Sequence, residues 1–262
     1  MTRAERRRRL KDDQRLVARG LEEDRRDHVQ IMALMRLLHD RLEESRDAGT
    51  VAPLMTFLHG NFRAAEQAAP KKSLACRMGC SHCCHAWVSA RAPEVLFVKA
   101  AIPVREREAV RAAVEATFAL TGPLGFEERV KRPTPCPLLR DDLCLVYAAR
   151  PATCRTAVSR DVAACERAFR LGSEDEDIPT PTFYIEMRAG YSLALAGALR
   201  RAGFPAAAYE YNAALNAVLG TPDAEAAWLA GEDVFAGIAC DPSGDPFDRQ
   251  VNRRIYDAAW AA

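Results

Sequence analysis

Four of the chain's nine cysteines lie within the nine residues CRMGCSHCC, at positions 76–84. Cysteine thiolates are ligands for zinc and iron, and four of them complete either a tetrahedral zinc site or an iron-sulfur cluster. The short gaps let Cys76, Cys80 and Cys83 converge on one centre, and Gly79 allows the chain to bend tightly between them. This spacing predicts a metal site.

A second group of four cysteines follows at positions 136–165, separated by gaps of seven, nine and ten residues. The ninth cysteine, Cys240, lies apart in the C-terminal region. Eight sulfurs would fill two four-ligand sites, or one site with spare thiols, and the sequence leaves both arrangements open.

The adjacent pair Cys83 and Cys84 is the sharpest feature of the first group. Neighbouring side chains diverge by about 100° on a helix and point to opposite faces on a strand. We therefore expect one of the two thiols to serve a different centre or to pack as a small apolar residue. The flanking His82 and His85 could replace a thiolate, but we favour their being loop histidines or hydrogen-bond donors near the ligands.

The motif CRMGCSHCC, followed by CPLLRDDLCLVYAARPATCR, resembles the YkgJ-type cysteine-cluster family, which is described as a zinc- or iron-chelating domain. The resemblance covers about residues 76–165. Members are often labelled iron-sulfur oxidoreductases, a label that rests on the cysteines. The resemblance implies metal or cluster binding by eight residues, the last of which fits the pattern less closely: Cys76, Cys80, Cys83, Cys84, Cys136, Cys144, Cys154 and Cys165.

Three further residues, Tyr147, Arg150 and Arg155, belong to the same motif. A guanidinium next to the ligands, above all that of Arg155 beside Cys154, would donate hydrogen bonds to thiolates and offset their charge. An equally weighted alternative is that Arg150 and Arg155 form ordinary ion pairs while Tyr147 fills the core.

The composition narrows the class of protein. The chain has 262 residues, a formal net charge of +1 and no apolar run of transmembrane length, so neither a nucleic-acid partner nor a membrane span is expected. The basic N-terminus lacks the apolar stretch of a secretory signal. We therefore expect a cytoplasmic protein, in which clustered cysteines bind metal or do redox chemistry and do not pair as stable disulfides.

The remaining pattern predicts a mainly α-helical protein with a small irregular cysteine-rich core and one short β-hairpin at Asp141-Asp142. Apolar residues at helical spacing predict a buried helix face at Ile31, Leu34, Met35, Leu38 and Leu42. We divide the chain into charged N-terminal helices (1–70), a cysteine-cluster metal-binding domain (71–171) and a C-terminal helical region (183–262). Residues 1–27 are expected to form a solvated helix.

An iron-sulfur cluster is the leading cofactor expectation, with zinc or iron ions second. An iron-sulfur cluster would suit a redox role. If the protein is an enzyme, it would then resemble an iron-sulfur oxidoreductase. The alternative is a structural zinc protein whose helical flanks bind an unidentified protein partner. The CxxxCxxC spacing also occurs in radical S-adenosylmethionine enzymes, but the strand–helix alternation of their barrel is missing here.

Overall fold

The structure of the protein is a computed structural model that describes residues 27–69, 74–173 and 176–261. The helix predicted for residues 1–27 lies outside these ranges, apart from its last residue. The described chain is mainly helical, as predicted, with two small two-stranded sheets. None of its helices is long and apolar enough to cross a membrane.

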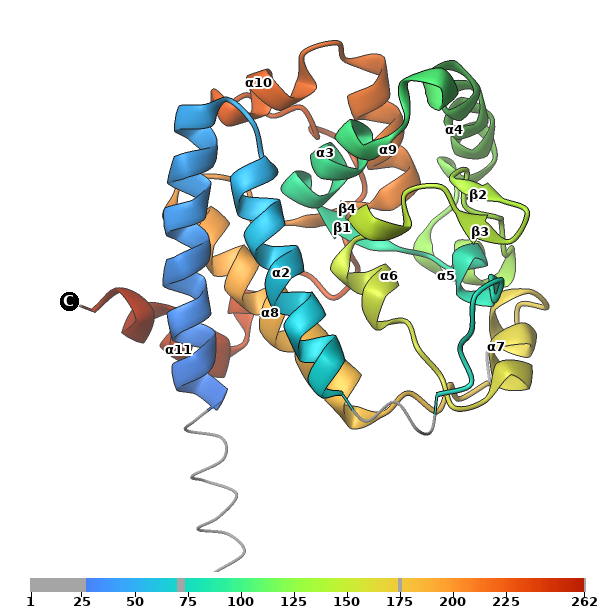
Figure 1. The fold of residues 1–262 in the computed structure, drawn as a ribbon, viewed down its shortest axis with the longest axis horizontal. Helices are drawn as coiled ribbons and strands as arrows, with labels where there is room; N and C mark the ends of the chain where they lie inside the picture. Colours follow the sequence, from blue (N-terminus) through green and yellow to red (C-terminus); the bar gives the residue numbers. More distant parts are fainter. Residues whose placement is uncertain (1–26, 70–73, 174–175, 262) are drawn as a thin grey trace, which may run out of the picture.

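Three long helices form one side of the molecule (Figure 1). A helix at residues 27–48 and α2 (Ala52–Ala68) lie beside α8 (Thr182–Arg201). The predicted apolar stripe is confirmed, because Met35, Leu38 and Leu42 are fully buried. These helices thus bury apolar side chains against one another and form a large part of the core.

The other side gathers shorter helices around the pair β1 (Ser89–Arg91) and β4 (Ala208–Glu210). These strands run antiparallel and join the cysteine-bearing segment to the C-terminal segment. All three predicted segments contribute to one core cluster. The remaining helices of this side and of the C-terminus are α3 (Ala92–Ala101), η3 (Val104–Glu106), α4 (Arg107–Thr121), α9 (Tyr211–Gly220), α10 (Ala224–Leu229), η5 (Pro246–Asp248) and α11 (Gln250–Trp260).

The predicted hairpin is present and consists of β2 (Leu139–Arg140) and β3 (Leu143–Cys144). Its two turn residues, Asp141 and Asp142, have φ angles of 48° and 60°, which match the left-handed backbone of a type I′ turn. The elements around it are short: η2 (His82–His85), α5 (Phe126–Lys131), η4 (Tyr147–Ala149), α6 (Ala152–Thr156) and α7 (Val162–Phe169).

The helix α9 begins later than the residue types before it suggest. Pro205 would suit the first turn of a helix, but β4 comes first and α9 begins only at Tyr211. The backbone of β4 pairs with β1, and the Glu210 carboxylate accepts a hydrogen bond from the Ala213 N–H (2.6 Å). The pairing of β4 with β1 and the cap at Glu210 therefore explain why the helix begins at Tyr211.

A substitution at Gly197 tests how closely α8 packs against the helix at residues 27–48. A Cβ atom at this position would overlap side-chain atoms of the fully buried Met35. We expect Gly197→Ala to lower the free energy of unfolding by about 1–3 kcal/mol, as overpacking does. Denaturant titration of the purified variant measures it.

Gly190→Ala is the matched control on the same helix, because its Cβ would lie 3.7 Å from Ile31, an ordinary contact. The gain in helix propensity should stabilise this variant by up to about 1 kcal/mol. Equal stabilisation by both substitutions would contradict the close approach at Gly197.

Candidate metal centre

One cavity of about 610 Å³ gathers most of the predicted ligands. Its walls come from η2 and the loop before it, from the hairpin region and from the start of α6. Each of the cysteines that line it is half-buried as a residue, and all nine cysteines are free. The six cysteines that line it are Cys80, Cys83, Cys84, Cys136, Cys144 and Cys154.

The backbone holds the two cysteine groups together directly. The Cys136 N–H donates to the carbonyl oxygen of Cys84 (2.8 Å), so the second group begins against the end of the first. Cys144 then lies on β3 and Cys154 on α6. Hydrogen bonds between distant segments, in addition to sequence spacing, therefore position these sulfurs.

A polar cluster that the sequence did not reveal joins η2, the hairpin and α7. The Ser81 hydroxyl donates to the Asp142 carboxylate. Arg170 donates to both, at 3.0 Å from Ser81 Oγ and 3.2 Å from Asp142 Oδ1. These residues stand within or beside the cysteine motifs, but their pairing depends on the turn at Asp142 and has no sequence signature.

Cys76 and Cys165 do not line the cavity but lie next to it. Burial raises the pKa of the Cys76 thiol, and the nearby thiols of Cys80 and Cys83 raise it further. Burial likewise raises the pKa of Cys165, with Cys76 and Cys83 among its neighbours. Cys83 thus adjoins both this pair and the cavity. The exposed Cys240 lies apart, with its thiol against the Ile238 carbonyl and its backbone bridged to Tyr209.

The adjacent thiols Cys83 and Cys84 do not diverge as expected. Both line the same cavity, and a hydrogen bond between their side chains is the main cause of the raised pKa of Cys83. They sit on η2, a tight 3₁₀ turn around which the cavity wraps. The tight turn explains how two consecutive side chains reach one space.

Arg150 is a cation of the cavity wall that acts on several of the sulfurs. Its charge lowers the thiol pKa values of Cys76, Cys83 and Cys154, against the larger effect of burial. Its guanidinium stacks 3.7 Å from the centre of the Tyr147 ring, which is 63% exposed. Tyr147 therefore does not fill the core, and it holds Arg150 at the cavity wall.

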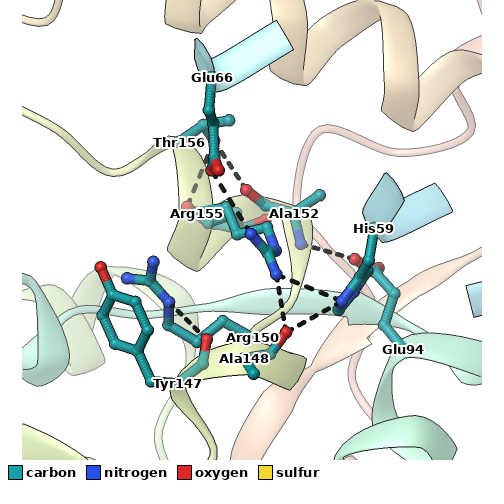
Figure 2. Close-up of polar contacts among 10 residues, drawn as sticks. His59, Glu66, Glu94, Tyr147, Ala148, Arg150, Ala152, Arg155 and Thr156 are labelled. Atoms are coloured by element: carbon teal, nitrogen blue, oxygen red, sulfur yellow. Dashed lines mark hydrogen bonds and ion pairs between the residues drawn. The ribbon is translucent and has the colours of Figure 1, made fainter. Parts of the chain in front are cut away.

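Arg155 does not line the cavity and lies in a polar network with Glu66 and His59 (Figure 2). Its guanidinium lies 3.5 Å from Glu66 Oε1 and donates to the Ala148 carbonyl at 2.7 Å. His59 Nδ1 lies 3.3 Å from Arg155 Nη2 and 3.1 Å from the same carbonyl oxygen. Arg155 thus forms an ordinary ion pair, as the alternative interpretation of the sequence expected. This ion pair joins α6 to α2.

Arg129 is a buried cation of the cavity wall that sequence reasoning missed. It is 2% exposed and donates to the carbonyl oxygens of His85, Arg132 and Thr134. Its charge also acts on Cys136, whose pKa burial raises to about 12. Arg129 therefore supports the loop before Cys136 and places positive charge next to its sulfur.

The donor set suits zinc or iron. Thiols dominate it, and the buried Nδ1 atom of His82 has no hydrogen-bond partner among the described residues, so one imidazole nitrogen is free beside Cys83. His85 is engaged, with Nδ1 3.2 Å from the Ser81 carbonyl oxygen. No three His, Cys, Asp or Glu side chains of the described chain are grouped tightly enough for a single ion.

The buried His59 makes stability depend on pH. Burial, and then the charge of Arg155, lower its pKa from 6.5 to about 4. The unfolded chain therefore binds a proton near pH 6.5 that the folded chain accepts only near pH 4. The contribution of His59 to the free energy of unfolding should be complete above pH 6.5. The free energy of unfolding should then fall by up to about 3 kcal/mol as the pH drops to 4.

His59→Gln isolates this contribution, because glutamine does not titrate. Urea unfolding across the window from pH 6.5 to 4 should give the variant a shallower loss of stability than the wild type has. The same pH slope in both proteins would refute the assignment to His59.

Comparison with known proteins agrees with this donor set. A search of the curated proteins and of the solved structures gave no match to the chain. A family model does match, over residues 75–174, and this range contains the six cysteines of the cavity together with Cys76 and Cys165. The matched family, which the cysteine spacing resembled, is CxxCxxCC, a "putative zinc- or iron-chelating domain".

Proposed function

We propose that the cysteine-lined cavity binds an iron-sulfur cluster and gives the protein a redox role. The observation that carries the proposal is the convergence of six thiols, from three separate stretches of chain, on one cavity. When bound, such a cluster supplies one-electron chemistry. The chain's own residues would hold it by their sulfurs and screen it from water.

The spread of the thiols favours a cluster over a single ion. Zn–S bonds are about 2.3 Å long, so the sulfurs around one zinc must lie within about 4 Å of each other. The described ranges contain no group of three His, Cys, Asp or Glu residues placed to hold one ion, and the cavity measures about 610 Å³. A cluster with its own sulfides would bridge this larger space.

The surrounding cations also support a thiolate centre. Arg150, Arg129 and Arg140 each lower the pKa of at least one cavity thiol by their charge, against the larger effect of burial. Arginine remains charged at every physiological pH. Together they would offset the negative charge of several thiolates and so stabilise the loaded state.

A structural zinc site is the second candidate, because the description of the matched family names zinc as well as iron. In this case the metal would hold η2, the hairpin and α6 together, and the helical flanks would be free to bind a protein partner. The free state of all nine cysteines suits the reducing cytoplasm in either case.

Metal content tests the site. Anaerobically purified wild-type protein should contain iron with acid-labile sulfide, or else zinc. Cys154→Ser should lose most of the metal, because Cys154 lies among Cys136, Cys83 and Cys144. Cys240→Ser is the matched control, since Cys240 is exposed and outside the cavity, and should keep full occupancy. Folded wild-type protein without bound metal would overturn the proposal.

Absorbance separates the two candidates. A cluster should give visible absorption that bleaches with dithionite, whereas a zinc protein should be colourless. Chelation of a structural zinc should also unfold the cysteine segment, which circular dichroism would follow. A colourless, zinc-loaded protein that unfolds on chelation would reject the cluster and retain the second candidate.

A further inference from the structure

A second cavity, of about 420 Å³, lies on the other side of the wall formed by Trp87, Thr153 and Arg188. These three residues line both cavities. The second cavity extends between β1, α8 and the loop near Asp241 and is lined by no cysteine. Its volume falls in the usual range for small-molecule sites, about 300–1,000 Å³.

Arg91 places a buried cation in this second cavity. It is 7% exposed, and its donors reach only neutral acceptors, with Nε on the Ala206 carbonyl (3.2 Å) and Nη1 on Ser192 Oγ (2.8 Å). No hydrogen bond of Nη2 is found within the described chain, and Arg91 is one of the residues that line the cavity. Glu94, Asp241 and Asp245 act on this charge electrostatically, but none of them forms an ion pair with it, so the guanidinium can still hydrogen-bond an incoming anion.

Arg188 adds a second positive charge, at the boundary of the two cavities. It is exposed and, among the described residues, has no hydrogen bond or ion pair. Arg188 projects from α8, as does the Ser192 that orients Arg91. One helix therefore positions both cationic ends of the cavity.

The carboxylates of the cavity wall are already engaged by the protein itself. Glu94 accepts hydrogen bonds from the backbone N–H groups of Arg91 (2.8 Å) and Ala152 (2.7 Å). Asp241 accepts from Ser243, whose N–H lies at 2.8 Å, and from the side chain of Ser89. Neither forms an ion pair with Arg91 in the described structure, although both act on it electrostatically. The guanidinium groups are therefore the free charged groups of the site.

We propose that this second cavity binds a small carboxylic acid next to the cysteine centre, with its carboxylate held by Arg91 and Arg188. Guanidinium groups match the two oxygens of a carboxylate. The two wall carboxylates disfavour a doubly charged phosphate. The ring of Trp87 and the stacked pair Phe62 and Tyr191 offer apolar surface for the carbon skeleton of the acid.

Calorimetric titration and thermal shift of the full chain test the proposal. The probes are acetate, propionate and benzoate, each a singly charged acid compared with its uncharged amide at fixed ionic strength. At least one acid should bind and raise the melting temperature, and its amide should not. Failure of all three acids to bind the wild type would overturn the proposal.

Arg188→Gln is the main variant, because Arg188 is exposed and the substitution should leave the fold intact. It should weaken binding of the acid by roughly 10- to 100-fold, the loss expected for a hydrogen bond to a charged group. Arg254→Gln, an exposed arginine outside both cavities, should bind like the wild type. Wild-type binding by Arg188→Gln, or an equal loss in Arg254→Gln, would refute the site.

Arg91→Gln should abolish binding, and circular dichroism must first show that this variant folds. The titrations are run on metal-loaded and metal-free protein, so that the result is separate from the metal proposal. Binding that needs the metal and ignores Arg188→Gln would assign the acid to the metal and reject the second cavity. Binding in both forms would support the cavity whatever the cysteines hold.

Discussion

One buried carboxylate, that of Glu94, fixes the geometry on which both cavities depend. It is 4% exposed, and its two oxygens accept the backbone N–H groups of Arg91 and Ala152. It thereby joins the start of α3 to the start of α6, two residues before Cys154. Without these two bonds Glu94 would be a buried charge without compensation, so the segments cannot separate cheaply. The position of one wall of each cavity follows from this constraint.

Much of the fold was predictable from periodicity and turn chemistry. The buried stripe of Met35, Leu38 and Leu42 follows from helical spacing, and the hairpin follows from the apolar runs around Asp141-Asp142. The capping role of Glu94 agrees with its residue type, because a glutamate after Pro93 suits the first turn of a helix. Such features depend on neighbours in the sequence, which is why the sequence alone indicates them.

What the sequence could not indicate depends on contacts between distant segments. The strands β1 and β4 are three residues each, too short for a periodic signal, and they pair across more than a hundred residues. Arg155 follows a cysteine in the motif, yet its charge is drawn to Glu66 and not to the sulfurs. Cys83 and Cys84 share one cavity because η2 is a tight turn, which their adjacency did not suggest. Tertiary contacts decided the strand pairing and the place of Arg155, and the local geometry of η2 decided the place of the two cysteines.

The convergence of the cysteines has a consequence for the chain as a polymer. A metal held jointly by the segments around Cys84 and Cys136 would close a loop of about 50 residues, as a covalent cross-link does. Cross-links of this length stabilise a fold by about 4 kcal/mol, mainly because they restrict the unfolded chain. α3, α4 and α5 all lie inside that loop. The centre would then stabilise helices that do not touch the metal. Their resistance to unfolding would therefore report whether the metal is bound.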